Sequence, residues 1–374
     1  MKRAVSLLLC VILAFGAVVT VSAEGTTTEA EAYVLYCMDS GEILASKNAD
    51  KRMKPASTTK LMTALLTLEQ AAKGNKTVTF TEEMTAEGSS MYLKPGEKVT
   101  LRDLAVGMMM SSGNDAANAA ATTIGGSPER FAALMNRRAA ELGMKNTHFV
   151  TPSGLDDDDH YSTAYDLALL MAAGLRNADF ARLTAQKSAT VDFAEPANKK
   201  ITYSNHNRLL SLYPYCIGGK TGYTMSAGRC LVSAARKDGL TLICVTLNDR
   251  RDWDDHAALY EYGFSQRCLY QSPDSAFCAE VPVVGGSTEV AVMMADQDFS
   301  FPVRTGDKEK IRRRILLDSF LYAPIGEGEE VGRIVYTLGG KEIGATPLTA
   351  AAAVTTPAEE PGLFQKIKEF FTHG

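Results

Sequence analysis

The pattern of apolar and polar positions divides the chain into a helix-containing part and a later part made of short strands. Between residues 32 and 47, two apolar runs flank the turn-forming residues Met38–Glu42, which predicts a β-hairpin. Further along, apolar residues recur at helical spacing. Helices are therefore predicted over residues 59–66, 101–110, 115–124, 128–142 and 165–173.

A second hairpin is predicted where two β-rich apolar runs, residues 229–235 and 240–247, are joined by Asp238-Gly239. A last helix is expected around residues 256–262. The predicted order is a hairpin, a set of helices, a second hairpin and a closing helix. This order is typical of an α+β fold and not of an α/β fold, in which strands and helices alternate. We therefore expect a first domain over residues 30–266 with an antiparallel sheet flanked by helices.

From about residue 275, short apolar runs are broken by Gly, Pro and Asp, which is typical of a small β-rich domain. The clearest runs are Val281–Val284, Glu289–Met294 and Glu330–Thr337. We expect this second domain to cover residues 275–350 and to be followed by an Ala/Thr/Pro-rich linker over residues 351–362.

Residues 1–23 have the pattern of a signal peptide. Lys2 and Arg3 precede an apolar run, and Val21-Ser22-Ala23 offers small residues for cleavage after Ala23. The alternative is an uncleaved membrane anchor, but the run is shorter than the roughly 20 apolar residues that a spanning helix needs. The protein is therefore predicted to be exported to the extracytoplasmic face of the membrane.

Residues 363–374 are predicted to form an amphipathic helix that lies on a membrane surface. The apolar side chains that share one helical face are Leu363, Phe364, Ile367, Phe370 and Phe371. The segment is too short to span a bilayer, and a Phe-rich face suits the lipid interface. A helix packed on its own domain is the alternative.

Charge and cysteine content exclude some classes of function. The net charge of the 374 residues is −5, and it becomes −7 once Lys2 and Arg3 are removed with the signal peptide. A nucleic-acid-binding protein needs a basic surface, so that class is discounted.

The six remaining cysteines match no metal pattern or disulfide framework. We expect them to be small buried side chains, with disulfide pairing left open: Cys37, Cys216, Cys230, Cys244, Cys268 and Cys278.

Three short motifs stand in a fixed order: Ser57-Thr58-Thr59-Lys60, Ser112-Gly113-Asn114 and Lys220-Thr221-Gly222. Each alone fits an ordinary helix cap, loop or turn, and S-x-x-K and S-x-N are each expected about once by chance in such a chain. The ordered set is far less common. It is typical of serine enzymes that are acylated by penicillin.

The first two motifs bring together a nucleophile and a base. A serine hydroxyl is a poor nucleophile near neutral pH, so a base must lie within hydrogen-bond reach. Residues three apart at a helix start share one face, which would place Lys60 beside Ser57. Burial lowers the pKa of a lysine and so suits Lys60 to act as the base. Ser112 is expected to relay a proton, and Asn114 to hold the substrate amide.

The third motif supplies binding groups. Lys220 provides positive charge in the cleft, and Thr221 provides a hydroxyl for a carboxylate. Gly222 lacks a side chain, which lets a substrate backbone lie along the strand edge. The backbone N–H groups of Ser57 and Tyr223 are expected to form the oxyanion hole.

The sequence around these motifs resembles the D-alanyl-D-alanine carboxypeptidases, which are low-molecular-mass penicillin-binding proteins. The resemblance extends from about residue 30 to the C-terminus. The segments that carry it are Pro55–Thr63, Ser112–Ala117, Thr147–Leu155, His160–Asp166, Gly219–Thr224 and Val331–Ile334.

The resemblance implies a penicillin-binding/β-lactamase-like catalytic domain that removes the terminal D-alanine from peptidoglycan stem pentapeptides through an acyl-enzyme on Ser57. It also implies covalent capture of β-lactams, a membrane tether at the C-terminus, and no cofactor or metal. Family members place an arginine near the substrate carboxylate, and both Arg250 and Arg251 stand in that neighbourhood. The acidic run Asp156–Asp159 lacks the alternating spacing of a calcium loop and is expected to be a solvated loop at the cleft rim.

Two other functions remain open from the sequence. A class A β-lactamase shares part of the motif set, but the glutamate loop that drives its fast deacylation is not found here, and the second domain has no counterpart there. A catalytically silent envelope-binding module is the other possibility. It would have no physical need for a lysine beside the serine.

Overall fold

The computed structural model describes residues 28–357, so the predicted signal peptide and terminal helix lie outside the described residues. The chain forms two compact units. The first unit contains most of the residues up to Tyr260, and the second contains Glu261 onward together with two hairpin tips, Cys37–Gly41 and Arg236–Thr241. Each unit is described separately below.

A five-stranded sheet forms the centre of the first unit, in the order β2-β1-β9-β8-β7. Its strands are β1 (Ala32–Cys37), β2 (Ile43–Lys47), β7 (Cys216–Thr224), β8 (Gly228–Lys237) and β9 (Leu240–Leu247). Both predicted hairpins are present. Asp238 and Gly239 adopt positive φ angles of 49° and 85°, as a two-residue hairpin turn requires.

All the predicted helices are present, with ends that differ by a few residues. They are α1 (Lys60–Lys73), α2 (Leu101–Met110), α3 (Asn114–Gly125), α4 (Pro128–Glu141), α5 (Ala164–Arg176) and α8 (Asp252–Gln266). Side-chain caps explain several starts: Thr100, Ser127 and Thr163 each accept a hydrogen bond from a backbone N–H of the first turn.

The sequence pattern did not predict the short elements of this unit, because runs of three to seven residues carry too little periodicity. They are β3 (Thr77–Thr79), β4 (Lys98–Thr100), α6 (Ala178–Thr184), β5 (Ser188–Asp192), β6 (Lys200–Ser204) and α7 (Leu209–Leu212).

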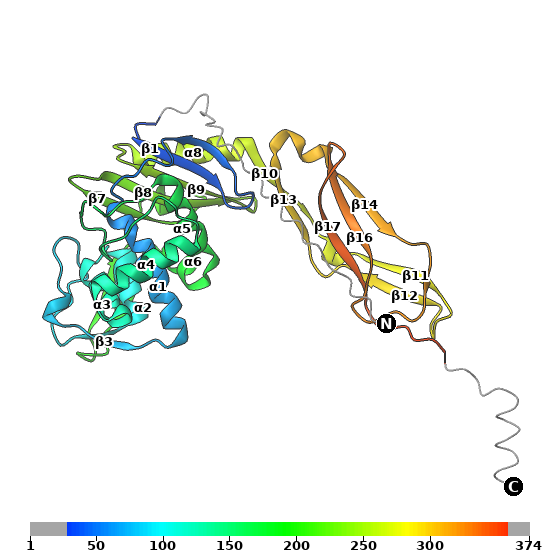
Figure 1. Ribbon diagram of the computed structural model, residues 1–374, viewed down its shortest axis with the longest axis horizontal. Helices are drawn as coiled ribbons and strands as arrows, with labels where there is room; N and C mark the ends of the chain where they lie inside the picture. Colours follow the sequence, from blue (N-terminus) through cyan, green and yellow to red (C-terminus); the bar gives the residue numbers. More distant parts are fainter. Residues whose placement is uncertain (1–27, 358–374) are drawn as a thin grey trace, which may run out of the picture. The chain divides into compact units, whose positions relative to one another are not determined.

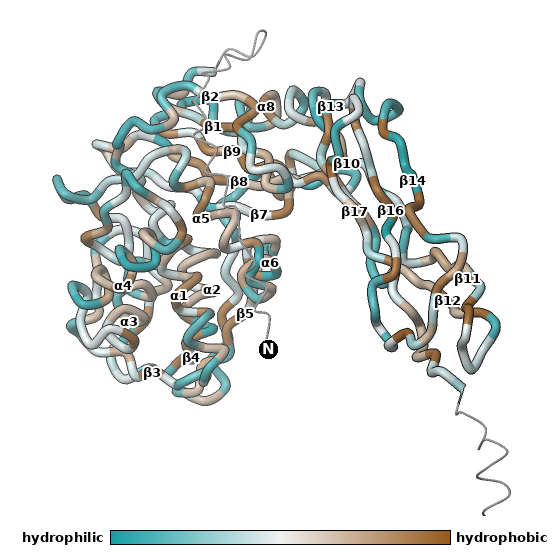
Figure 2. The backbone as a smooth tube through the Cα atoms, turned by 45° about the vertical axis from the view of Figure 1, so that its right-hand side comes forward, coloured by the Kyte–Doolittle hydropathy of each residue, from teal (hydrophilic) through white to brown (hydrophobic). Residues whose placement is uncertain are grey.

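Helices cover both faces of the five-stranded sheet: α8 lies on one side, and α1 to α6 gather on the other (Figure 1). Most residues of α1 and all residues of β9 are buried in the core of this unit, and hydrophobic segments recur among its elements in Figure 2. Against α8, a buried polar chain joins helix and sheet. Ser233 Oγ lies 2.7 Å from both His256 Nδ1 and Tyr260 OH. Burial lowers the pKa of His256 to about 3, so this histidine is a neutral packing residue.

The second unit is β-rich, as predicted. A six-stranded sheet has the order β14-β16-β17-β12-β11-β15, and β10 pairs with β13. The strands are β10 (Arg267–Ser272), β11 (Cys278–Val284), β12 (Val290–Met294), β13 (Phe299–Arg304), β14 (Arg312–Leu317), β15 (Leu321–Tyr322), β16 (Glu330–Leu338) and β17 (Lys341–Ala350). An α+β unit followed by a β-rich unit is therefore the observed fold class.

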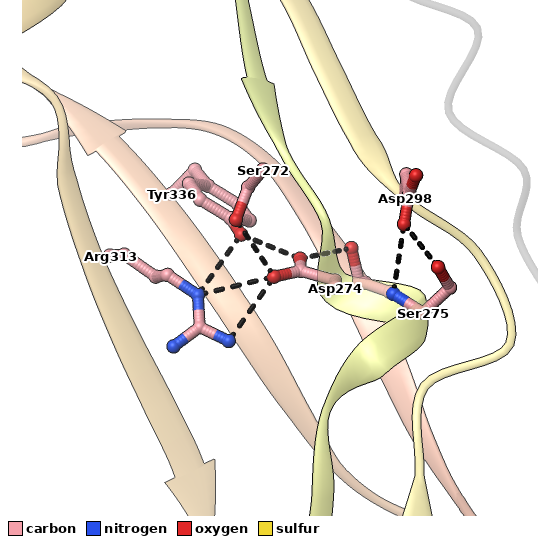
Figure 3. Close-up of polar contacts among 7 residues, drawn as sticks. Ser272, Asp274, Ser275, Asp298, Arg313 and Tyr336 are labelled. Atoms are coloured by element: carbon pink, nitrogen blue, oxygen red, sulfur yellow. Dashed lines mark hydrogen bonds and ion pairs between the residues drawn. The ribbon is translucent and has the colours of Figure 1, made fainter.

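A buried carboxylate organises the second unit (Figure 3). Asp274 accepts hydrogen bonds from Ser272, Tyr336 and Thr346, and it forms an ion pair with Arg313 at 3.1 Å. Burial alone would raise the pKa of Asp274, but these hydrogen bonds together hold it below its usual value. Every partner is a side chain of the same unit, so the network is a structural one.

The six cysteines of the described residues are free thiols. Cys37, Cys230 and Cys244 are buried, as expected. The expectation is wrong for Cys278, which is exposed at the start of β11, and it holds only in part for Cys216 and Cys268, which are partly buried. None of the helices in residues 28–357 is both long and apolar enough to cross a membrane.

Candidate active site

Ser57 lies in a tight turn at the start of the helix that the sequence predicted. The 3₁₀ turn η1 (Ala56–Thr59) immediately precedes α1, which begins at Lys60. Side chains three residues apart in a 3₁₀ turn are aligned one above the other, which explains why Ser57 and Lys60 face each other. Ala56 has a positive φ of 49°, a strained conformation directly before the serine.

The side chain of Lys60 is fully buried and makes three short polar contacts. Its Nζ lies 2.9 Å from Ser57 Oγ, 2.6 Å from Asn114 Oδ1 and 2.7 Å from the carbonyl oxygen of Ser153. Burial lowers the pKa of Lys60 well below its usual value, and the nearby charge of Lys220 lowers it further.

As an ammonium ion, Lys60 donates to all three of these oxygens; once it is neutral, the same contacts determine the direction of its hydrogen bond with Ser57. A neutral lysine amine has two N–H bonds and one lone pair. The oxygens of Asn114 and Ser153 can only accept, so they take the two N–H bonds. The lone pair is then left for the hydroxyl proton of Ser57. This arrangement is the one that a general base needs.

Ser112 and Lys220 form a second pair of polar side chains. Lys220 Nζ donates to Ser112 Oγ at 3.0 Å and to the carbonyl oxygen of Thr221 at 2.7 Å. Both side chains are buried, and burial lowers the pKa of Lys220 to about 7. Ser112 has a positive φ of 58°, so the backbone at this turn is held in an unfavourable conformation.

Asn114 and Asp115, at the start of α3, hold parts of the site in place. The Asn114 amide nitrogen donates to the carbonyl oxygen of Glu87, while its oxygen accepts from Lys60. Asp115 accepts from the backbone N–H groups of Met91 and Leu93. Asn114 is thus in direct contact with the proposed base, in addition to any contact it makes with a substrate.

Strand β7 borders a cavity of about 310 Å³ that contains Ser57. Gly222 allows β7 to run close to the serine: a Cβ built on Gly222 would lie 3.0 Å from both Ser57 N and Pro55 O. The cavity is lined by Ser57, Ser89, Ser112, His206, Thr221, Gly222, Tyr223, Arg229, Asp252 and Trp253. Five of the eight residues singled out in the sequence line this cavity: Ser57, Ser112, Thr221, Gly222 and Tyr223. The other three are joined to them by hydrogen bonds, since Lys60 contacts Ser57 and Asn114, and Lys220 contacts Ser112.

Several residues of the site carried no signal in the sequence. Ser153 contributes a backbone oxygen, which no side-chain pattern reveals. His206, Asp252 and Trp253 line the cavity from segments outside the three motifs. Asp252 and Trp253 precede the helix predicted around residues 256–262 and belong to the first turn of the observed α8.

The arginine at the cavity is a different one from those considered in the sequence. Arg229, at the start of β8, lines the cavity, whereas Arg250 and Arg251 are not among its lining residues. Arg251 instead lies 3.6 Å from Asp254 on the surface. The strand register explains the difference, because Arg229 is the cross-strand partner of Tyr223.

The acidic run Asp156–Asp159 lies beside the end of β7. Thr224 Oγ1 donates to Asp156 Oδ1 at 2.9 Å, and Asp158 lies 3.5 Å from Lys54. Within residues 28–357, no group of three or more acidic, histidine or cysteine side chains is arranged to hold a metal ion. The hydroxyl groups of Thr224 and Ser226 both donate to Asp156 and so hold this loop beside the strand end.

Comparison with known proteins identifies relatives over nearly the whole chain. Residues 17–251 match the family model of the D-alanyl-D-alanine carboxypeptidases, and residues 264–356 match that of the penicillin-binding protein 5 C-terminal domain. DacF of Bacillus subtilis, a D-alanyl-D-alanine carboxypeptidase, is 33% identical over 369 residues, which cover 94% of each chain. DacC of Escherichia coli, another such carboxypeptidase, is 35% identical and covers 96% of this chain and 90% of its own.

Solved structures give the same result. Penicillin-binding protein 5 from Haemophilus influenzae matches with a TM-score of 0.65 and 31% identity, over 88% of this chain and 98% of that chain. A D-alanyl-D-alanine carboxypeptidase from Mycobacterium tuberculosis matches with a TM-score of 0.61 and 35% identity, over 65% of this chain and 96% of that chain.

Proposed function

Because the chain belongs to the serine-type D-alanyl-D-alanine carboxypeptidases, with a penicillin-binding protein 5 C-terminal domain, we propose that Ser57 is the nucleophile that removes the terminal D-alanine from peptidoglycan stem pentapeptides. The observation that supports this role most strongly is the contact set of Lys60. Two acceptors occupy its N–H bonds and leave its lone pair for the Ser57 hydroxyl.

In the first step, Ser57 Oγ attacks the carbonyl carbon of the penultimate D-alanine, and its proton passes to the neutral amine of Lys60. The oxygen of that carbonyl becomes an oxyanion, which the backbone N–H groups of Ser57 and Tyr223 stabilise. Gly222 supports this role because its missing side chain keeps β7 close to Ser57 N.

In the second step, the C–N bond breaks and D-alanine leaves. Its amine takes a proton relayed by the hydroxyl of Ser112, which Lys220 supplies across their 3.0 Å contact. A water molecule then attacks the ester on Ser57. The water proton recharges Lys220 through Ser112, and Lys60 returns its proton to Ser57 Oγ. Both lysines end the cycle as they began it, and one peptide bond has been hydrolysed.

Peptide substrates and β-lactams share this site in the family. In a β-lactam, the same attack opens the four-membered ring, and the amine stays attached to the acyl group. We infer that Thr221 and Lys220 bind the carboxylate that both kinds of ligand carry, since both residues lie on β7, the edge strand of the five-stranded sheet.

A labelled penicillin tests this function directly. A stable covalent adduct with the wild-type protein, lost in Ser57→Ala, is the result that a carboxypeptidase predicts. Rapid hydrolysis without a lasting adduct would indicate a β-lactamase, and no reaction at all would indicate a binding module. Release of D-alanine from a stem pentapeptide, measured in the same preparation, completes the assignment.

We also propose that the protein is exported and tethered to the membrane surface by residues 363–374, which lie outside the described residues. The apolar face of that segment and the Pro-containing linker before it support this location. A mature protein truncated after Glu360 should remain soluble, react normally with penicillin and no longer sediment with lipid vesicles. If the truncated protein still sediments with vesicles, the terminal segment is not the tether.

A further inference from the structure

One side of the six-stranded sheet in the second unit carries exposed apolar side chains. On β12, Val290, Val292 and Met294 point away from the core, because they alternate with the buried residues Ala291 and Met293. Residues directly opposite each other in the pairing of β11 with β12 share one face of the sheet. The outward residues of β11 therefore extend this surface, and they are Cys278, Glu280, Pro282 and Val284.

Strand β15 completes this surface, which we call the apolar face. Tyr322 of β15 is the partner of Val284 in a parallel pairing and is 68% exposed. The reverse side of the same strands is a packed core. Single apolar residues are ordinary on a protein surface, but a contiguous patch across three strands marks a contact site. The large apolar side chains of the face are Val284, Val290, Val292, Met294 and Tyr322.

The described chain ends beside the apolar face. The backbone N–H of Ser287 donates to the carbonyl oxygen of Thr355 at 2.7 Å, and the Thr355 hydroxyl donates to Ser287 Oγ at 3.2 Å. Ser287 lies in the turn between β11 and β12, which is flanked by Val284 and Val290. Residue 357 lies at the same end of the unit as this turn (Figure 1). Residues 358–374 therefore start at one end of the apolar face.

The length of this remaining chain fits the apolar face. The five linker residues 358–362 reach about 17 Å when extended, which is enough to turn back onto the sheet. The helix predicted from residue 363 to residue 371 would be about 14 Å long and about 10 Å wide. The five residues of β12 span about 16 Å, and three strands are about 10 Å across. The predicted helix would thus cover β12, β11 and β15.

The charges of the segment also complement the apolar face. Lys366 and Lys368 would stand on the two sides of the apolar stripe of the helix, each about 100° from its centre. The apolar face contains a carboxylate, Glu280, which attracts lysines and repels anionic lipid head groups. Arg312 and Arg314 lie on β14, at the opposite edge of the sheet. Charge at the apolar face therefore favours a lysine-bearing peptide over a bilayer.

We propose that, away from lipid, residues 363–371 fold back and pack their apolar side chains on the apolar face of the second unit. The same side chains cannot contact the sheet and a bilayer at once, so lipid must release them. The docking is independent of the carboxypeptidase chemistry, and only its release by lipid rests on the membrane tether proposed above. Docking thus keeps a Phe-rich segment covered until the protein meets a membrane.

Cross-linking of the mature protein tests the docking, because Cys278 supplies an exposed thiol on the apolar face. The segment starts at the Val284 end of β11, so its C-terminus would lie near Cys278 at the other end. Gly374→Cys places a second thiol on the apolar side of the predicted helix, four residues after Phe370, and Thr372→Cys places it on the opposite side.

A short bis-maleimide should join positions 278 and 374 within one chain at least about fivefold more efficiently than positions 278 and 372, because docking raises the effective concentration of one pair only. Peptide mapping by mass spectrometry identifies the product, and Cys278→Ser should abolish it. Vesicles of phosphatidylethanolamine and phosphatidylglycerol should also suppress it, because they compete for the apolar side of the segment.

Val292→Lys should undock the segment without unfolding the sheet. It places a charge in the middle of the apolar face, opposite Glu280, with which the new side chain can pair. The 278–374 product should fall by about tenfold, and the affinity for the same vesicles should rise by about threefold to tenfold, because more of the segment is free. Urea unfolding checks that the variant is folded.

Ile315→Lys is the matched control. Ile315 is 44% exposed, but it lies on the other side of the sheet, opposite the buried residue Ile334. Both the cross-linked product and the affinity for vesicles should therefore stay at the level of the parent protein.

Each contrary outcome has a distinct meaning. Equal cross-linking from positions 372 and 374 would overturn the docking, because a docked helix presents only one side to the sheet. A product that joins two chains would overturn it in favour of a second copy on the apolar face. Weaker vesicle binding by Val292→Lys would show that this face itself contacts lipid. Failure of the unmodified protein to bind vesicles would overturn the tether and the release by lipid, and it would leave the docking standing.

Discussion

His160 Nε2 lies 2.9 Å from Thr59 Oγ1, the side chain that directly precedes Lys60. On its other side, His160 Nδ1 accepts hydrogen bonds from the backbone N–H groups of Val150 and Thr151, at 3.0 and 3.2 Å. Two donors at Nδ1 place the ring proton on Nε2, which therefore donates to Thr59. A neutral histidine thus joins the turn that carries Ser57 to the loop that supplies the Ser153 carbonyl.

Acid should destabilise the protein through this histidine. Burial lowers the pKa of His160 to about 4, from an ordinary value of 6.5. Between those two pH values the unfolded chain binds the proton more readily than the folded one, so stability falls as the pH falls from 6.5 to 4. The pKa difference corresponds to a loss on the order of 3 kcal/mol. Urea unfolding of wild type and His160→Gln at pH 7 and pH 4.5 measures it.

His256 contributes a similar loss in both proteins, because burial lowers its pKa to about 3. Only the difference between wild type and His160→Gln therefore reports on His160. The variant should be less stable at pH 7 and should lose less stability on acidification. Identical pH dependence in the two proteins would show that His160 is not held neutral by the fold.

Gly154 should tolerate no side chain, because it packs against the turn before the nucleophile. Its φ is +83°, and a Cβ at this position would lie 1.9 Å from the carbonyl oxygen of Ala56. Gly154→Ala should cost more than about 3 kcal/mol of unfolding free energy and slow acylation, since Ala56 must move. Urea unfolding and the rate of penicillin labelling are the measurements.

Gly143 provides the matched control. Its φ is +78°, and no atom lies within 4 Å of a Cβ built there. Gly143→Ala should therefore cost only the backbone strain, about 1–2 kcal/mol, and leave acylation unchanged. Equal effects of the two substitutions would mean that φ alone, and not the contact with Ala56, explains Gly154.

Replacement of Lys60 should remove the base. Lys60→Met fills a similar volume and should slow acylation by about 10²- to 10⁴-fold. In wild type, the acylation rate should rise with pH as Lys60 loses its proton, because the neutral amine is the active form and burial lowers its pKa. Stopped-flow acylation by a fluorescent penicillin measures both effects.

Lys73, an exposed residue at the end of the same helix, serves as the control for Lys60. Lys73→Met should acylate at the wild-type rate. A wild-type rate that does not change with pH from mildly acidic to alkaline solution would contradict the role of Lys60 as the base.

Thr221 should matter chiefly for ligands with a terminal carboxylate. Thr221→Val keeps the β-branched shape of the side chain in β7 and removes the hydroxyl that lines the cavity. For an acyl-D-alanyl thioester that ends in a free carboxylate, we expect kcat/KM to fall by about tenfold, the value of one charge-assisted hydrogen bond. For the methyl ester of the same thioester, kcat/KM should be nearly unchanged. Equal losses on both would point to a damaged strand instead.

The sequence predicted those parts of the fold and site that depend on local pattern. The hairpin at Asp238-Gly239 has the turn chemistry that its backbone requires, and α2 begins and ends where its periodicity does. Ser57 and Lys60 were expected to face each other, and they do so at 2.9 Å. Their spacing of three residues was sufficient to predict this contact, although the turn is 3₁₀ rather than α-helical.

What the sequence did not predict depends on register and on backbone atoms. Arg229 reaches the cavity because β8 pairs with β7 in a register that places it opposite Tyr223, and no local pattern encodes that register. The Ser153 carbonyl oxygen is the third contact of Lys60 Nζ. Because every residue has a carbonyl group, the sequence does not show which one will contact the lysine. The role of His160 depends on its contacts with both Thr59 and the Val150–Thr151 backbone. Thr59 is distant from His160 in the sequence, so no local pattern marks the histidine as a positioning residue.

The central claim is that Ser57 is the acylated residue, and peptide mapping by mass spectrometry after reaction with penicillin tests it most directly. Wild-type protein should gain the mass of one penicillin, located on the peptide that contains Ser57, and Ser57→Ala should fold normally and gain none. An adduct on a different residue, or one that persists in folded Ser57→Ala, would contradict the account.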